Sequence, residues 1–216
     1  MPLNNYQIKL LAAAFMLVDH IGAVFFPQIL AFRAVGRLSF PLFAWLIAQG
    51  ESHTRSIGKY AGRLFLFGIV TQPVYRWLFD TEQLNVLFTL LIGLLAIRLG
   101  KNFPTYRYLI WAIAILISSL IPMDAGSYGV ITVLLMAALP LRPVWWGLWL
   151  GLHLLYVVIL QDSSSVQLFA VFAPLFVWAA NLERGQRARW FYLFYPGHLV
   201  GLLLIEWWLH SGAGSR

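Results

Sequence analysis

The first apolar segment of the chain carries a cation and an imidazole at a spacing suited to acyl transfer from a phosphorylated cofactor. Lys9 precedes His20 by eleven residues, which comes within about 20° of three helical turns, so both side chains share one helix face about 16.5 Å apart along the axis. Lys9 could hold the phosphates of coenzyme A while the thioester reaches toward His20. An imidazole can act as a general base on an incoming hydroxyl or amine.

Asp19 is a second ionisable residue in this segment, directly before His20. An ionisable side chain at mid-membrane costs from about 2.5 kcal/mol upward, which makes it a functional candidate by default. Consecutive helical residues point about 100° apart, so a simple Asp19–His20 dyad is not expected. We expect Asp19 to face a donor on another segment, with Arg37 as a candidate, and to support His20 through its charge. The alternative is structural: Lys9 snorkels to the surface and His20 hydrogen-bonds a neighbouring helix.

The last apolar segment holds a second histidine, His198, at a depth similar to that of His20. His198 lies nine residues, about 13.5 Å, from Arg189, with Tyr195 on its helix face. Pro196 between them frees a backbone carbonyl and allows a bend. Two histidines at one depth suit a metal pair, but no third ligand is evident at that level, so no metal is predicted. Tyr195 and His198 would orient substrates or stabilise the thioester oxyanion, or else only pack helices.

Polar residues near the ends of other segments suggest binding functions. Arg37 and Asn85 begin two segments on one side of the membrane, where with Arg76 they could line an outward-facing acceptor mouth. Interfacial anchoring is the alternative for the two arginines. On the other side Arg63 follows Lys59 by four residues on one helix face, which suits cofactor phosphates or lipid headgroups. Three further histidines show no evident partner: His53, His153 and His210.

Composition indicates a membrane protein. Of the 216 residues, 61% are apolar and 11% charged, against about 45–50% and about 25% in an average soluble domain. The mean hydropathy is +0.77. The net charge of +7 comes without a basic tail or a nucleic-acid-binding motif, so no nucleic-acid partner is expected. The chain has no cysteine, which excludes disulfides, thiolate metal sites and a cysteine nucleophile.

Apolar runs between charged residues, Gly, Pro and Ser predict an all-α, polytopic transmembrane helix bundle of about nine spans, within a range of about eight to ten. The predicted spans are Ile8–Leu30, Ala34–Gln49, Ile57–Phe79, Leu84–Leu99, Tyr106–Ile121, Ser127–Pro140, Val144–Leu160, Val166–Ala180 and Trp190–His210. No long extramembrane stretch separates them. Residues 1–216 are therefore predicted to form a single integral membrane domain.

The basic residues predict the orientation. The N-terminal end and the loops on its side hold 11 of the 15 Lys and Arg residues with two acids, whereas the opposite side holds four of each. The 11 are Lys9, Arg55, Lys59, Arg63, Arg98, Lys101, Arg107, Arg142, Arg184, Arg187 and Arg189, and the four are Arg33, Arg37, Arg76 and Arg216. Basic residues concentrate in cytoplasmic loops. The N-terminus is thus predicted to be cytoplasmic and the protein to lie in a bacterial-type inner membrane, in contact with its lipids.

The ordered motifs of the chain resemble those of the TraX family from the first span to the last. They are Met16–Gly22 (MLVDHIG), Gly36–Phe43 (GRLSFPLF), Asn85–Leu90 (NVLFTL), Asp124 with Tyr128–Gly129, and Tyr195–His198 (YPGH). The namesake of this family is the conjugative F-pilin acetylase, which acetylates the pilin N-terminal amine with acetyl-CoA. The resemblance implies a membrane acetyltransferase that uses acetyl-CoA as co-substrate. Its acceptor would be a small membrane protein or another amine or hydroxyl compound.

The first three spans are also similar to the acyltransferase-three membrane fold, whose first helix carries Arg, ten residues and His. Here Lys9 replaces that arginine, which keeps the charge but gives up bidentate phosphate recognition. This similarity implies that His20 is the catalytic base and that Arg63 contacts cofactor or substrate.

Together these patterns predict a membrane-embedded acyltransferase. Its catalytic residues would be His20 and Asp19, its cofactor residues Lys9 and Arg63, and its substrate or oxyanion residues Arg37, Asn85, Tyr195 and His198. Two other classes stay open. Polar mid-span residues also suit a small-solute transporter, although the chain lacks the internal repeats of that class. A non-catalytic membrane assembly factor is the third possibility.

Overall fold

The computed structural model describes residues 2–138, 142–160, 166–183, 185–186 and 190–212, whose regular structure is helical without a β-strand. The α-helices are α1 (Asn5–Phe25), α2 (Leu30–Gly36), α3 (Ser39–His53), α4 (Ile57–Phe79), α5 (Val86–Asn102), α6 (Arg107–Leu120), α7 (Gly126–Ala137), α8 (Pro143–Leu160), α9 (Ala173–Trp178) and α10 (Phe191–Gly212). Two 3-10 helices are η1 (Pro104–Tyr106) and η2 (Val166–Phe172). The predicted all-α class is confirmed.

Each predicted span overlaps at least one helix, and α4 has the predicted bounds. Within the described residues, however, only Asn5–Phe25 and the Leu30–His53 stretch are long and apolar enough to cross a membrane. Helices α5, α6 and α7 have 17, 14 and 12 residues, fewer than the roughly 20 that span a bilayer core. Nine membrane crossings therefore stay a prediction.

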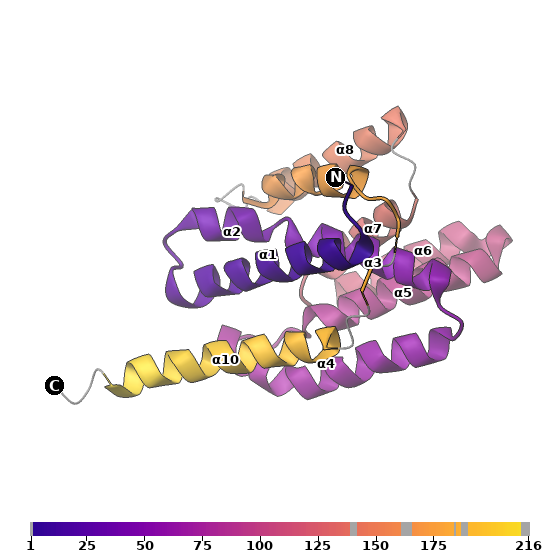
Figure 1. The fold of residues 1–216 in the computed structure, drawn as a ribbon. Helices are drawn as coiled ribbons and strands as arrows, with labels where there is room; N and C mark the ends of the chain where they lie inside the picture. Colours follow the sequence, from indigo (N-terminus) through magenta and orange to yellow (C-terminus); the bar gives the residue numbers. More distant parts are fainter. Residues whose placement is uncertain (1, 139–141, 161–165, 184, 187–189, 213–216) are drawn as a thin grey trace.

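The largest departure from the predicted spans follows α1. This helix ends before Pro27, because proline disfavours helical conformation in the residue that precedes it. The chain then turns back, and α2 lies along α1 (Figure 1). The two helices approach closely at two glycines: a Cβ on Gly22 would lie 2.2 Å from Cβ of Phe32, and a Cβ on Gly36 would lie 2.2 Å from Oδ1 of Asp19. The short α2 is thereby held beside Asp19.

Helix α3 lies at the centre of the bundle and packs on α1, α5 and α7. Helices α4 and α10 lie side by side along one flank, and α8 lies on the opposite side (Figure 1). Fully buried side chains of this interior include Ile8 on α1, Leu42 and Trp45 on α3, Leu94 on α5 and Trp149 on α8. The interior therefore holds α1 and α3 in fixed positions, and these helices carry much of the candidate site.

Glu51 forms ion pairs with two basic residues at one end of the bundle. Its side chain at the end of α3 is 1% exposed and forms ion pairs with Arg98, at 2.9 Å, and with Lys101, both near the end of α5. Glu51, Arg98 and Lys101 therefore lie at the same end of the bundle. The sequence-based orientation also assigns Arg98 and Lys101 to one side of the membrane. Which side of a membrane that end faces stays a prediction. Of the basic residues used for the orientation, four lie outside the described residues: Arg184, Arg187, Arg189 and Arg216.

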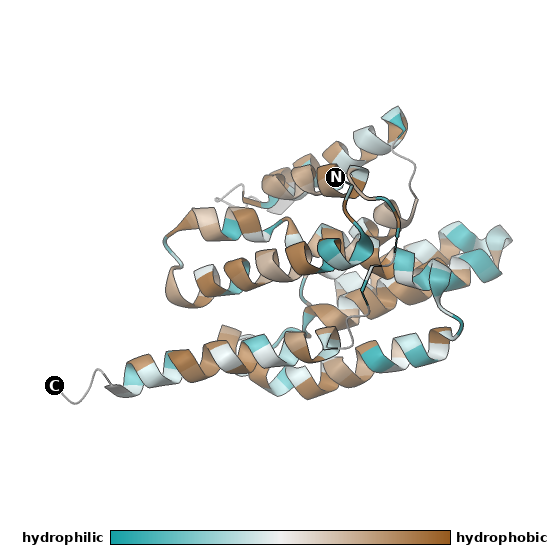
Figure 2. Cartoon of the chain, in the orientation of Figure 1, coloured by the Kyte–Doolittle hydropathy of each residue, from teal (hydrophilic) through white to brown (hydrophobic). Residues whose placement is uncertain are grey.

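Large apolar side chains cover much of the outer surface, and hydrophobic residues recur along the helices (Figure 2). Strongly exposed examples are Trp77 at 78%, Leu120 at 72%, Val144 at 75% and Trp207 at 66%. They lie on α4, α6, α8 and α10, so apolar exposure extends over several helices. Large exposed apolar surfaces mark membrane or protein contacts.

Candidate active site

Two unlike cavities adjoin beside α1. The larger, about 370 Å³, is lined mainly by apolar and aromatic side chains and also by Lys9 and Arg63. The smaller, about 140 Å³, has a more polar lining that includes His20. Three residues line both cavities and form the junction between them: Met16, Phe43 and Val86.

His20 on α1 is hydrogen-bonded to His198 on α10, with 2.9 Å between Nδ1 of His20 and Nε2 of His198 and an angle of 11° between the ring planes. Nδ1 of His198 lies 2.8 Å from the carbonyl oxygen of Phe194, and a carbonyl only accepts, so this nitrogen is assigned the proton. Nε2 of neutral His198 is then an acceptor, and Nδ1 of His20 is its donor. Nε2 of neutral His20 is left without a proton, as a general base requires.

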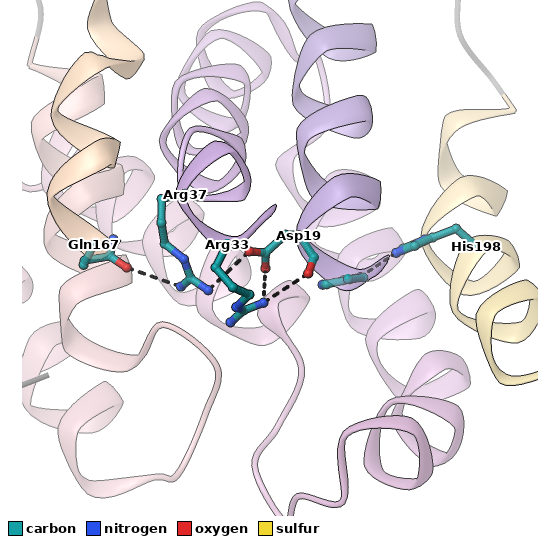
Figure 3. A network of polar contacts seen from close by, with 6 residues as sticks. Asp19, Arg33, Arg37, Gln167 and His198 are labelled. Carbon is teal, nitrogen blue, oxygen red and sulfur yellow. Dashed lines mark hydrogen bonds and ion pairs between the residues drawn. The ribbon is translucent and has the colours of Figure 1, made fainter. Parts of the chain in front are cut away.

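Asp19 faces α2 rather than His20. Its Oδ2 lies 2.7 Å from Nη1 of Arg33, and its Oδ1 lies 3.3 Å from Nη2 of Arg37 (Figure 3). The expected Arg37 partner is confirmed, and Arg33 joins it because α2 folds back along α1. The hydrogen-bond partner of His20 is therefore a histidine, and support of His20 by the Asp19 charge stays a prediction.

Arg37 also begins a chain of hydrogen bonds that runs into the interior. Its Nη1 donates to Oε1 of Gln167 at 3.3 Å, and Nε2 of Gln167 donates to the Tyr128 hydroxyl at 2.7 Å. Tyr128 lies 3.0 Å from Nε2 of His153, whose Nδ1 donates to the Trp149 carbonyl at 2.8 Å. The expectation that His153 has no partner is thus wrong, since it is fully buried and ends this chain. The chain fixes Arg37 at the wall of the smaller cavity.

Asp124 brings a second carboxyl group to the smaller cavity. Its backbone N–H donates to the Leu84 carbonyl at 2.8 Å, which ties the α6–α7 loop to the start of α5. Burial raises the pKa of Asp124, and the charges of Arg37 and Arg33 partly offset this effect while that of Asp19 adds to it. Asp19, Arg37 and Asp124 therefore line this cavity together, and Arg33 is connected to them through its ion pair with Asp19.

The larger cavity brings together the two cations predicted to bind the cofactor. Nζ of Lys9 lies 5.8 Å from the centre of the Phe191 ring, and the Arg63 guanidinium lies 5.3 Å from the centre of the Tyr192 ring. Nε of Arg63 also donates to the Tyr192 hydroxyl at 3.1 Å. Both rings belong to α10, so this helix helps to direct both cations to one cavity.

The side chain of Asn85 connects α4 to α5 by hydrogen bonds. Its side chain caps α5 by accepting from the Leu87 N–H at 3.1 Å, and its amide donates to the Gly68 carbonyl and to Oε1 of Gln72, each at 2.8 Å. The residue is fully buried and lines neither of the two cavities. Asn85 therefore joins α4 and α5, and its substrate or oxyanion role stays a prediction.

Tyr195 lies where the larger cavity approaches His198, with 5.6 Å between the two ring centres. Its side chain is 6% exposed. The hydroxyl lies near the backbone N–H of Val86 but makes no well-formed hydrogen bond with a described residue. Tyr195 therefore lines the larger cavity and holds a buried hydroxyl beside Val86.

Comparison with known proteins places the chain in a family. The sequence model described as TraX protein matches residues 4–206. The chain belongs to the TraX family. It is 31% identical over 231 residues to the probable fimbrial assembly protein FimC, serogroup H1, of Dichelobacter nodosus, which covers 91% of this chain and 93% of that protein. The uncharacterized protein RP591 of Rickettsia prowazekii (strain Madrid E) is 27% identical over 103 residues, 46% of this chain and 39% of that protein. No solved structure matches the chain.

The motifs of this TraX-family chain meet around the smaller cavity. Its lining includes Met16, Asp19 and His20 from the first motif, Arg37, Phe40 and Phe43 from the second, Val86 from the third, and Asp124 and Tyr128 from the fourth. His198 of the last motif completes the set through its bond to His20. Segments far apart in the sequence therefore build one site.

Three residues of the site in this TraX-family chain were not predicted from the sequence. Arg33 carries a signal, since it lies four residues before Arg37 and such residues share a helix face. Gln167 and His153 carry none, because they lie 39 and 25 residues from their shared partner Tyr128. No group of three His, Cys, Asp or Glu side chains in the described part of the chain could hold a metal ion.

Proposed function

We propose that this protein is a membrane-embedded acetyltransferase that moves the acetyl group of acetyl-CoA to an amine or hydroxyl acceptor. The observation that carries the proposal is the junction of two unlike cavities beside His20, one apolar with two cations and one polar. A nucleotide-linked donor and a polar acceptor require such different sites. Because one relative is named a probable fimbrial assembly protein, we favour the N-terminal amine of a pilin or fimbrial subunit as acceptor.

The larger cavity suits the donor in both charge and polarity. Its mainly apolar lining matches the pantetheine arm of coenzyme A. Lys9 and Arg63 supply positive charge for the phosphates, and Lys9 lies about 16.5 Å from His20 along α1. The exposed position of Arg63 leaves the nucleotide at the cavity mouth.

His20 is the base in the proposed reaction. Its Nε2 takes a proton from the acceptor amine or hydroxyl as that group attacks the thioester carbonyl carbon. The carbon–sulfur bond breaks, and the proton passes to the departing thiolate, so the products are acetylated acceptor and free coenzyme A. His198 holds His20 in the tautomer that leaves Nε2 free. Asp19 and Arg37 shape the acceptor side of the site.

Membrane embedding and orientation belong to the same proposal. The exposed apolar side chains on several helices and the two helical stretches long enough to span a bilayer support it. The end that holds Arg98 and Lys101 would face the cytoplasm, following the distribution of basic residues. Acetyl-CoA would enter from that side, and the acceptor would arrive from the membrane or its outer face.

Release of coenzyme A tests the proposed reaction. The chain has no cysteine, so a thiol reagent reports only released coenzyme A. Purified protein in lipid nanodiscs is given acetyl-CoA and a peptide with a fimbrial-subunit N-terminus. We expect wild-type protein to release coenzyme A, His20→Ala to abolish the release at an unchanged unfolding temperature, and His210→Ala, an exposed histidine on α10, to behave as wild type. Wild-type protein that releases none contradicts the proposal.

A non-catalytic assembly factor is the second candidate, and the name of the D. nodosus relative favours it. Such a factor would hold a subunit without modifying it. It predicts that His20→Ala and His198→Ala proteins still support fimbrial assembly and that the subunit N-terminus carries no acetyl group in wild-type cells. Mass spectrometry of assembled subunits separates the two candidates.

A further inference from the structure

The junction between the two cavities is built by side chains from three helices. Met16 lies on α1 four residues before His20, so the two share a helix face. Phe43 lies on α3, where its ring is 5.8 Å from that of Phe191. Val86 is the first residue of α5. An acyl group that passes from the cation-bearing cavity to His20 must lie against these side chains.

The junction also offers hydrogen-bond donors. Tyr195 lines the larger cavity with Val86, and its buried hydroxyl lacks a partner of good geometry within the described structure. The backbone N–H of Val86 is one of the first N–H groups of α5, which have no partner inside their own helix. A carbonyl oxygen placed here would meet a hydroxyl donor, a backbone donor and the positive end of a helix dipole.

The size of the smaller cavity limits what the junction can accept. Its volume is about 140 Å³, and in the proposed reaction it must also receive the attacking group of the acceptor. Met16 is 7% exposed and packs in a cluster that contains Tyr195. A long acyl chain would therefore have to displace packed side chains.

We propose that Met16, Phe43 and Val86 enclose the acyl group of the donor thioester and restrict the enzyme to short acyl chains, while the Tyr195 hydroxyl binds the thioester carbonyl oxygen. This inference rests on the proposed function, since it assigns the position and size of the transferred group in that reaction. The bonds made and broken are those given above: the acceptor joins the acyl carbon, and the sulfur departs with the proton.

Binding of acyl-CoA to a protein that cannot turn it over tests the size limit. In a His20→Ala background, calorimetry compares acetyl-CoA with octanoyl-CoA. We expect the unmodified junction to bind acetyl-CoA at least tenfold more tightly, and Met16→Ala or Phe43→Leu to reduce this ratio at least fivefold. Phe67→Leu is the matched control, because Phe67 lines only the larger cavity and its loss should change both affinities alike. An unchanged ratio in both folded junction variants overturns the size limit.

The hydroxyl of Tyr195 has its own test in the otherwise wild-type protein. Tyr195→Phe removes only this group, so we expect kcat to fall about 100-fold, the usual effect of losing one oxyanion donor, with KM for acetyl-CoA within about threefold. An unchanged kcat overturns this role. Failure of the proposed function and failure of the size limit give different results. If the protein binds no acyl-CoA, the proposed function is wrong. If it binds and turns over acetyl-CoA but the junction variants keep the same chain-length preference, only the role of the junction is wrong.

Discussion

His20 donates from Nδ1 to Nε2 of His198 across 2.9 Å, while Nδ1 of His198 is held by the Phe194 carbonyl. The direction of both bonds follows from one fact, that a carbonyl oxygen cannot donate. The pair therefore selects one tautomer of His20. In the proposed reaction His198 is a positioning residue that acts through His20.

Replacing His198 should slow the reaction without weakening donor binding. His198→Phe keeps a ring to stack on Phe194, now 4.8 Å from the His198 ring, but offers no acceptor to His20. We expect kcat to fall about 10- to 100-fold, below the roughly 100- to 10,000-fold contribution of a general base because His20 itself is kept, with KM for acetyl-CoA unchanged. His198→Gln, which restores an acceptor oxygen, should recover part of the loss.

Nitrogen NMR of the His20 ring provides the decisive control for that substitution. The wild-type protein should show a proton on Nδ1, and His198→Phe should show a mixture of tautomers. A purely structural role of His198 predicts no tautomer change in a folded variant, and that result would contradict the assignment.

The ion pairs of Asp19 should matter for stability. Asp19→Asn leaves Arg33 and Arg37 without a carboxylate in a partly buried site, where side-chain exposures are 16% for Asp19 and 31% and 26% for the arginines. Breaking a buried pair costs about 3–5 kcal/mol, and this exposure should reduce the loss to about 2 kcal/mol. Reversible unfolding in detergent measures it.

The exposed pair of Arg76 and Glu82 is the control for that loss. The side chains are 47% and 85% exposed, and such pairs contribute about 0–1 kcal/mol. Glu82→Gln should therefore leave stability within about 1 kcal/mol of wild type. Equal losses in Asp19→Asn and Glu82→Gln would show that the Asp19 pairs carry no special weight.

Arg63 should affect donor binding and not the chemical step. Arg63→Gln removes a cation from the larger cavity, and hydrogen bonds to charged groups contribute about 1.5–3 kcal/mol, so KM for acetyl-CoA should rise about tenfold with kcat retained. With acetyl-pantetheine, which lacks the nucleotide phosphates, the same substitution should have no effect.

Arg107→Gln is the matched control for Arg63. Its guanidinium lies 5.0 Å from the Tyr108 ring and Nη2 donates to the Tyr108 hydroxyl at 3.2 Å, much as Arg63 meets Tyr192. Arg107 lines neither of the two cavities, so its KM should equal that of wild type. A rise of equal size in both variants would indicate nonspecific charge attraction.

Asn85 should be needed for folding rather than for transfer. Asn85→Ala removes a helix cap, at a cost of about 1 kcal/mol, and takes the side-chain donor away from the Gly68 carbonyl, at about 1–3 kcal/mol, while Oε1 of Gln72 still accepts from the backbone N–H of residue 85. We expect the unfolding free energy to drop by about 2–4 kcal/mol, while kcat per folded molecule stays within about threefold. A variant of full stability with no activity would return Asn85 to the active site.

Local sequence patterns predicted the helices, because the length of an apolar run and the charged, Gly, Pro and Ser residues that bound it belong to one segment. Helix α4 has the predicted bounds. The helix period also placed Lys9 toward a cavity and gave His20 and His198 a common depth. It could not show that α2 folds back to bring Arg33 to Asp19, because that contact depends on Gly22 and Gly36 allowing close packing. The sequence also could not show that Asn85 caps α5, because a buried amide that caps a helix has the same sequence signature as one that faces a ligand.

Acetylation of the acceptor by reconstituted protein tests the central claim most directly. Wild-type protein in lipid vesicles is supplied with labelled acetyl-CoA and a fimbrial subunit, and mass spectrometry locates the label. The account predicts one acetyl group on the acceptor with wild-type protein and His210→Ala, and none with folded His20→Ala. Labelled acceptor produced by His20→Ala at the wild-type rate would contradict the role of His20 as the base.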